Sequence, residues 1–131
     1  ARPDARPEAD DEAVNNASIV LVARKPGFSA LLTGDIETEA QRALIPDVPP
    51  VQVLKVPHHG ARDQDPAFLA ATRAAISIIS AGENNDYGHP APSTLALLQR
   101  LGTRVYRTDR HGDIAIVPTP AGPAAVPRKG G

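Results

Sequence analysis

The segment VQVLKVPHHG, residues 51–60, joins an apolar run to a proline, two adjacent histidines and a glycine. Valine and leucine dominate its first six positions, which predicts a strand over 51–56 in the core of a sheet. Two imidazoles that follow Pro57 contribute neither to an apolar face nor to a helix. The segment therefore predicts a core strand that ends in chemically active side chains, His58 and His59.

On both sides of this strand, the chain alternates between short apolar runs and amphipathic stretches. Lys25-Pro26-Gly27 predicts a turn between two strands, and Asp65 followed by Pro66 is typical of a helix start. In chain order we expect strands over 17–24 and 28–34, a helix over 36–45, a strand over 51–56, a helix over 66–74, a strand over 75–80, a helix over 92–102, and strands over 103–108 and 112–118. This order predicts an α/β domain built in layers.

Composition limits the kinds of site that the chain can form. With 131 residues, 41% of them hydrophobic, the chain is long enough for one core and too short for two. A formal net charge of -1 gives no overall basic surface, so any contact with DNA must be local. The absence of cysteine excludes disulfides, zinc–thiolate sites and cysteine nucleophiles. A metal ion would therefore need imidazole and carboxylate ligands.

The two ends of the chain differ from its middle. They are rich in proline and alanine with charges or glycine, which predicts flexible tails over 1–14 and 118–131 around a domain over 15–117. No apolar run approaches the roughly 20 residues needed to cross a bilayer. We therefore expect this chain itself to be soluble.

Polar residues follow three of the predicted strands at the point where each strand ends. Asp35 follows the strand over 28–34, the histidine pair follows 51–56, and His89 lies in the loop after 75–80. In an open α/β sheet, functional groups gather in the loops beyond the strand ends. Asp35, His58, His59 and His89 are therefore expected to share one edge of the sheet.

Each of these residues also has a structural interpretation. Asp35 can cap the following helix or serve as a hard anionic metal ligand. The histidine pair can be a surface loop or a ligand site, and in an extended segment only one of the two rings would face a given ion. Turn chemistry explains the Gly, Asn and Pro residues of GENNDYGHPAPS but leaves Tyr87 and His89 unexplained.

Five segments, taken together in chain order, resemble a known protein family. They are NNASIVL (15–21), LLTGDIE (31–37), LKVPHHG (54–60), NDYGHP (85–90) and RTDRHGDI (107–114). Together they resemble the later half of the metallo-β-lactamase-like domain of the DNA-internalization competence protein family ComEC. The resemblance implies a metallo-β-lactamase-like αββα sandwich of which this chain covers about the C-terminal half, with a mixed sheet and two or three helices on one face.

The resemblance also implies site residues and cofactors. Asp35 matches an aspartate that bridges two metal ions, zinc or manganese, and His59 matches the last metal-binding histidine. His58 and His89 match catalytic positions near the substrate phosphate, while Tyr87 and Asp109 would orient the metal ligands or contact substrate. The HxHxDH motif of the superfamily is missing from this chain, and Ala61 replaces the usual serine after HHG. We therefore expect the two-metal site to be complete only in the complete domain.

Two functions follow as expectations. The first is part of a metal-dependent phosphodiesterase, a nuclease that hydrolyses the non-imported DNA strand in a DNA-uptake competence protein of the cell membrane. Its partners would be DNA, the missing N-terminal half of the domain and the membrane channel of the parent protein. The alternative is a non-catalytic module of the same fold that binds DNA or packs on a membrane channel.

Overall fold

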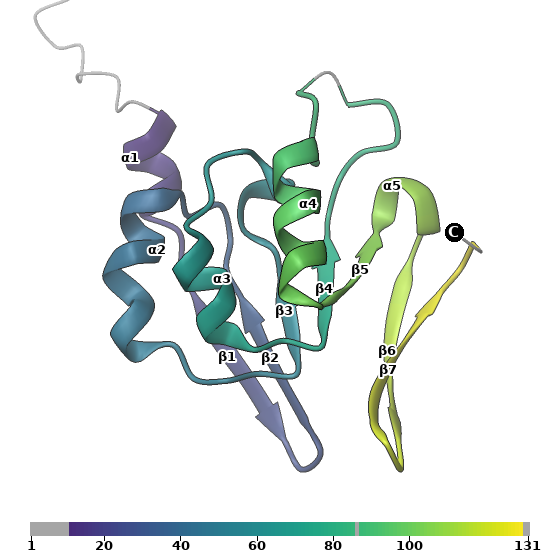
Figure 1. Ribbon diagram of the computed structural model, residues 1–131. Coiled ribbons are helices and arrows are strands. Elements are labelled where there is room, and N and C mark those ends of the chain that lie inside the picture. Colours follow the sequence, from purple (N-terminus) through teal and green to yellow (C-terminus); the bar gives the residue numbers. More distant parts are fainter. Residues whose placement is uncertain (1–10, 86, 130–131) are drawn as a thin grey trace, which may run out of the picture.

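The computed structural model describes residues 11–85 and 87–129 (Figure 1). Its main sheet has five strands in the order β1-β2-β3-β4-β5. The strands are β1 (Leu21–Lys25), β2 (Phe28–Leu32), β3 (Val53–Lys55), β4 (Ile76–Ile79) and β5 (Arg104–Arg107). β1 and β2 form the predicted antiparallel hairpin, and β2 to β5 run parallel. The sheet is therefore mixed.

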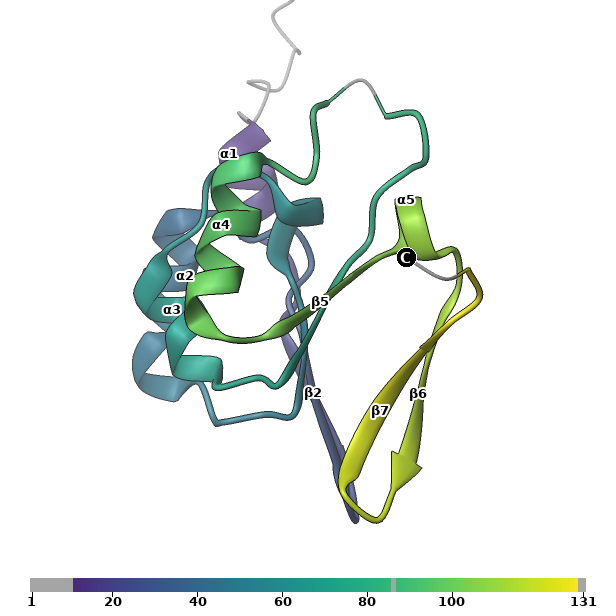
Figure 2. The same cartoon turned by 45° about the vertical axis from the view of Figure 1, so that its right-hand side comes forward.

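Helices cover one face of this sheet (Figures 1 and 2). They are α2 (Thr38–Leu44), α3 (Pro66–Thr72) and α4 (Pro92–Leu101), and α1 (Asp11–Asn16) lies beside α2. Three short helical turns complete the list: η1 (Ile45–Asp47), η2 (Pro57–Gly60) and α5 (Thr108–His111). The prediction of an α/β domain with a mixed sheet and helices is confirmed.

Local signals set the ends of two helices. The Asp65 carboxylate accepts hydrogen bonds from the backbone N–H groups of Ala67 and Phe68, at 2.9 and 3.1 Å. Asp65 is therefore the N-cap of α3, as expected from its side chain and from Pro66. Gly102 ends α4 in the left-handed conformation, with φ of 78°.

The main core lies between the sheet and the helices. Leu31 and Leu54 point from neighbouring strands toward this side, and Phe68 fills the space beneath α3 with none of its surface exposed. The next residues along the strands, Ala30 and Val53, are also buried, on the opposite face. Burial on both faces explains why these strands are almost continuously apolar instead of alternating with polar residues.

A second hairpin covers that opposite face (Figure 2). It consists of β6 (Ile114–Thr119) and β7 (Gly122–Pro127), and Ile116 and Ala125 pack against the cluster of Ala30, Val53 and Ile76. The chain thus contributes a helix layer, a five-stranded sheet and a two-stranded sheet.

β7 lies within 118–131, the segment that its composition predicted to be a flexible tail. In the ladder Pro118 pairs with Pro123, and Pro127 pairs with Ile114. Positions 114 and 118 are four residues apart, so all three prolines belong to the same alternate set of pairs. In an antiparallel pair, alternate residues direct their N–H groups away from the partner strand, so proline is tolerated there. The strand therefore forms despite its composition. Of the tail expected over 1–14, residues 1–10 lie outside the described residues, and the remainder begins α1.

None of the helices in residues 11–85 and 87–129 combines the length and the apolar character that a membrane span requires.

The packing of β6 against the sheet can be tested with two neighbouring residues. Ile116 faces the cluster of Ala30 and Val53, whereas the adjacent Val117 is 36% exposed. We expect Ile116→Ser to lower the free energy of unfolding by about 2 kcal/mol, since an apolar contact is replaced by a hydroxyl. Val117→Ser, the matched control, should change it by about 0.5 kcal/mol or less. Urea denaturation measures both, and equal losses would contradict the packing of the hairpin on the sheet.

Candidate functional site

Three loops meet at one edge of the main sheet, beyond the carboxyl ends of β2, β3 and β4. Their backbones are hydrogen-bonded to one another: His58 N donates to Gly34 O at 3.0 Å, and Ala91 N donates to Gly60 O at 2.9 Å. The first bond joins the TGD turn to the HHG turn, and the second joins the HHG turn to the loop that carries His89. The side chains expected to share one edge are thus brought together by main-chain bonds.

The two histidines of the HHG turn have an unusual backbone. His58 has φ of 50° and His59 has φ of 57°, both in the left-handed region. This conformation costs a non-glycine residue on the order of 1–3 kcal/mol and is concentrated at functional sites. The segment is therefore a tight left-handed turn, not the extended strand end that the sequence predicted. The two rings nevertheless have different neighbours, with centroids 6.1 Å apart.

Asp35 and His59 face each other. The distance between Asp35 Oδ1 and His59 Nε2 is 3.4 Å, and both side chains are partly open to solvent. His59 Nδ1 donates to the backbone oxygen of Ser80 at 2.8 Å, which leaves Nε2 directed at Asp35. The N-cap of α2 is Glu37, so Asp35 does not act as the helix cap that its position also allowed.

The TGD turn (33–35) that carries Asp35 is held by Ser18, which precedes it in the chain. The Asp35 N–H donates to Ser18 Oγ at 3.1 Å. Gly34 has φ of 55°, and a Cβ at this position would lie 2.7 Å from the Ser18 Cβ. Glycine is therefore required before Asp35, both for its backbone conformation and for the close approach of Ser18.

His58 points in a different direction from His59. Its Nδ1 lies 4.0 Å from Glu37 Oε1, and its side chain is 22% exposed. Within the residues that the structure describes, this Nδ1 is a buried polar atom with no hydrogen-bond partner. Glu37 itself is fixed by Asn15 and Asn16, which bond to its carboxylate and its N–H. A buried nitrogen without a partner is costly, and this one faces the Glu37 carboxylate instead of solvent.

His89 completes the group of histidines. Its ring lies 5.5 Å from that of His58 and 6.4 Å from that of His59, between centroids. Asn85 holds its backbone on both sides: the His89 N–H donates to Asn85 Oδ1, and Asn85 Nδ2 donates to the His89 oxygen, at 3.2 and 3.0 Å. Burial lowers the pKa of His89, and the nearby His58 and His59 lower it further. The neutral imidazole is therefore favoured.

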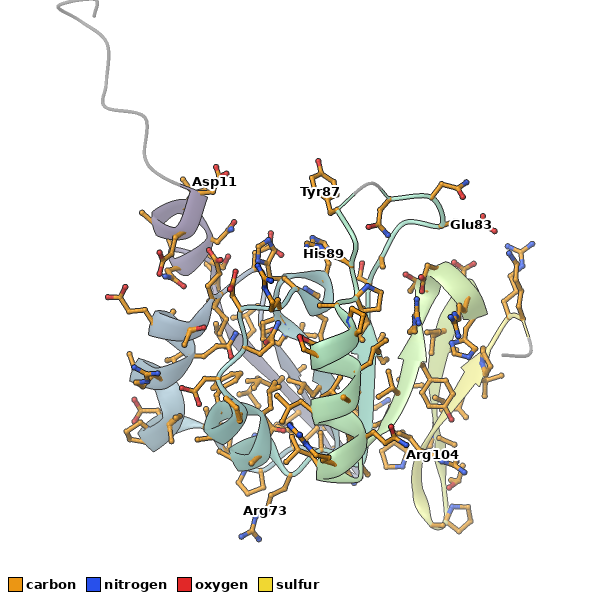
Figure 3. The ribbon with its side chains drawn as sticks, turned by 45° about the horizontal axis from the view of Figure 1, so that its top comes forward. Asp11, Arg73, Glu83, Tyr87, His89 and Arg104 are labelled. Atoms are coloured by element: carbon orange, nitrogen blue, oxygen red, sulfur yellow. The ribbon has the colours of Figure 1, made fainter. Side chains whose placement is uncertain are left out.

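Tyr87 lies above His89 at the outer end of the same loop, as Figure 3 shows. The two rings are 5.9 Å apart between centroids and inclined by 26°. A cavity of about 560 Å³ opens beside His58, Tyr87 and His89 and extends to the start of α4 at Pro92 and Ser93. The cavity is large enough to admit part of a substrate next to the histidines.

Asp109 occupies a different position. Its carboxylate accepts two hydrogen bonds from the Arg107 guanidinium, at 3.0 and 2.7 Å. These bonds lower the pKa of Asp109, against the opposing effect of burial. Asp109 therefore orders the turn of α5, which reaches the end of β4 through Thr108 and Ala81.

The pair of Asp35 and His59 fits two ligands of one metal ion. Ligand atoms that each lie about 2.1 Å from a tetrahedral ion are about 3.4 Å apart, which is the separation of Oδ1 and Nε2 here. A metal-binding histidine usually donates its other N–H to a carbonyl, as His59 does to Ser80. However, the part of the chain that the structure describes holds no group of three or more His, Cys, Asp or Glu side chains arranged for a metal ion. These residues therefore fit part of a metal site.

Three residues of this region were missed by sequence analysis. Lys55 Nζ donates to Gly34 O at 2.9 Å, and burial lowers the pKa of Lys55 while the charge of Asp35 opposes that shift. Gln64 Nε2 donates to the backbone oxygens of Pro57 and Ala61, at 2.9 Å each, which supports the left-handed turn from below. Gln41 in turn donates to Gln64 and is fully buried. A charged residue inside the apolar run VQVLKV was the one available signal, because it breaks the pattern of a buried strand.

Comparison with known proteins gives three relatives, and no family model matches the chain. ComE operon protein 3 of Bacillus subtilis is 44% identical over 112 residues, which are 82% of this chain and 14% of that protein. Competence protein ComA of Neisseria gonorrhoeae is 31% identical over 115 residues, 85% of this chain and 16% of its own length. Recombination protein 2 of Haemophilus influenzae is 30% identical over 103 residues, 78% of this chain and 13% of its own length. The chain thus spans about a seventh of the length of these relatives.

Close contact between the HHG turn and the His89 loop can be tested at Gly60. This residue has φ of 74°, and a Cβ there would lie 2.8 Å from the Pro90 Cβ. We expect Gly60→Ala to lower the free energy of unfolding by about 2 kcal/mol or more and to shift the NMR signals of His59 and His89.

Gly82→Ala is the matched control, since its Cβ would meet nothing closer than Asn85 Cβ at 3.8 Å. It should change the free energy of unfolding by about 0.5 kcal/mol or less. If both variants had the same stability and the same histidine signals, the two loops would not be in the contact described.

Proposed function

Because the chain is related to a segment of the competence-related proteins named above, we propose that it forms the C-terminal half of a metallo-β-lactamase-like αββα domain, part of a metal-dependent nuclease for DNA uptake. This nuclease would hydrolyse the DNA strand that is not imported. The observation that carries the proposal is the pair of Asp35 and His59, whose facing atoms are 3.4 Å apart within a group of histidines. A structural ion pair alone would not need His58 and His89 beside it.

In this function Asp35 and His59 hold metal, and the remaining ligands come from the preceding half of the domain. Two divalent ions, zinc or manganese, supply an activated water molecule and neutralise charge on the phosphate when they are bound. Ser80 fixes the His59 ring through Nδ1, so that Nε2 stays available at the site. Ser18 and Lys55 hold the turn that presents the Asp35 carboxylate.

His58 and His89 act on the substrate. Both line the cavity of about 560 Å³, where a phosphate group would lie. His89, for which the neutral imidazole is favoured, donates a hydrogen bond from its ring N–H to a phosphate oxygen, and Asn85 keeps its backbone in place. His58 contacts the same group from the wall of this cavity, while its buried Nδ1 faces Glu37. Asp109 supports the neighbouring turn through Arg107.

A second function is favoured by a different observation. Since residues 11–85 and 87–129 hold no three-ligand metal group, the chain could instead be a non-catalytic module of the same fold that binds DNA or packs on a membrane channel. In both cases the partners would be DNA, the N-terminal half of the domain and the channel part of a longer protein at the cell membrane. An HxHxDH segment encoded directly upstream of this chain favours the nuclease, and its absence favours the module.

The two-metal proposal predicts an order of effects among three substitutions. Asp35→Asn removes the negative charge with which this residue would hold the metal ions and should cost more activity than His58→Ala, for which about a 10- to 100-fold loss is expected. Asp35→Asn should also lower the metal content. His89→Ala should slow cleavage and leave the metal content nearly unchanged. The measurements are degradation of linear DNA with manganese or zinc, and metal content, in the protein that joins this chain to its upstream segment.

Asp113→Asn is the matched control, because the Asp113 side chain is 92% exposed and pairs with Arg128. It should retain full activity and metal. Full activity of Asp35→Asn would rule out the metal mechanism. Loss of metal on His89→Ala, or equal effects of Asp35→Asn and His58→Ala, would show that the roles are assigned to the wrong residues.

A further inference from the structure

Tyr87 is an aromatic side chain in solvent, in a chain that otherwise keeps its aromatic residues packed. The chain has two tyrosines, two phenylalanines and no tryptophan. Phe68 is fully buried, and Phe28 and Tyr106 pack against the cluster on the second face of the sheet. Tyr87 is 83% exposed. Its ring therefore contributes little to the core, and its position needs another explanation.

The Tyr87 ring continues a series of nearly parallel rings that leads into the site. Tyr87 lies 5.9 Å from His89 with an angle of 26° between the planes, and His89 lies 6.4 Å from His59 with an angle of 14°. His59 in turn faces Asp35. Figure 3 shows Tyr87 at the outer end of this series, with His89 between it and the body of the domain. A flat ring that approaches from solvent can therefore stack on Tyr87 in the same orientation as the rings of His89 and His59.

A cavity of about 280 Å³ lies beside these rings. It is lined by His59, Ala81, Gly82, Asn85, Tyr87 and His89. None of these side chains carries a fixed charge. The amide of Asn85 is already bonded to the backbone of His89 and Gly82, so it holds the walls in place and leaves a mainly apolar slot. Such a slot suits a flat, weakly polar ring better than an ion.

We propose that Tyr87 is a stacking platform for a nucleobase, and that this site takes single-stranded nucleic acid. Every base has a π-face, so stacking on tyrosine binds an unpaired nucleotide without regard to its sequence. In a duplex both faces of an internal base are covered by its neighbours, so the platform discriminates between single and double strands. The stacked base places its phosphate beside His58 and His89. The position of that phosphate depends on the proposed nuclease function, whereas stacking itself is measured without cleavage.

Tyrosine fluorescence tests the stacking directly. In the full chain carrying Tyr106→Phe, Tyr87 is the remaining tyrosine, and there is no tryptophan to mask its emission. A thymidine oligonucleotide should quench this emission without added metal, and an abasic oligonucleotide of the same length should not. We expect the thymidine oligonucleotide to bind about tenfold more tightly than the abasic one and than the corresponding duplex.

Substitutions at Tyr87 decide which part of the side chain matters. Because these variants lack the reporting tyrosine, their affinities are measured by the fluorescence anisotropy of dye-labelled oligonucleotides. Tyr87→Phe keeps the ring and should keep the tenfold preference, whereas Tyr87→Ala should lose it. Leu101→Ala is the matched control, an exposed apolar residue at the far end of α4. A preference that survives in Tyr87→Ala, or equal binding of the two oligonucleotides by the unsubstituted chain, overturns the proposal and assigns Tyr87 to a protein contact. Failure of the joined protein to cleave DNA, with quenching intact, would instead refute the nuclease.

Discussion

The hydrogen bond from His58 N to Gly34 O is the constraint on which the site depends. It joins the turn after β2 to the turn after β3, and the bond from Ala91 N to Gly60 O adds the loop after β4. Main-chain bonds of this kind leave side chains free for chemistry, unlike bonds made by the side chains themselves. The left-handed backbone of His58 and His59 is a cost that these bonds help to offset.

Support for the turn also comes from the core beneath it. Gln64 bonds to Pro57 and Ala61 on both sides of the histidines, and the fully buried Gln41 holds Gln64 and the N–H of Asp65. Buried amides are tolerated when their partners are satisfied, and a satisfied network specifies one arrangement of its members. Because Asp65 also caps α3, the same network links the position of that helix to the position of His59.

Two features of the chain fit the proposed sandwich. Asp35 and His59 offer two side chains where a catalytic zinc ion takes three protein ligands, and the second sheet has two strands where the first has five. In the proposed sandwich, the preceding half of the domain would supply both the remaining ligands and the remaining strands. One segment would then complete the site and extend the second sheet, so metal binding and assembly of the domain would be coupled.

The sequence by itself determined the features that depend on neighbours along the chain. These include the hairpin around Pro26-Gly27, the helix that Asp65 begins, the stop at Gly102, and the placement of Asp35, His59 and His89 after strands. Tertiary structure decided the rest: the left-handed HHG turn, the role of Lys55 and Gln64, and the strand formed by the proline-rich segment over 122–127. Each of these depends on bonds or packing between residues far apart in sequence. Local pattern and propensity carry no record of such contacts, so they appear only when the chain is folded.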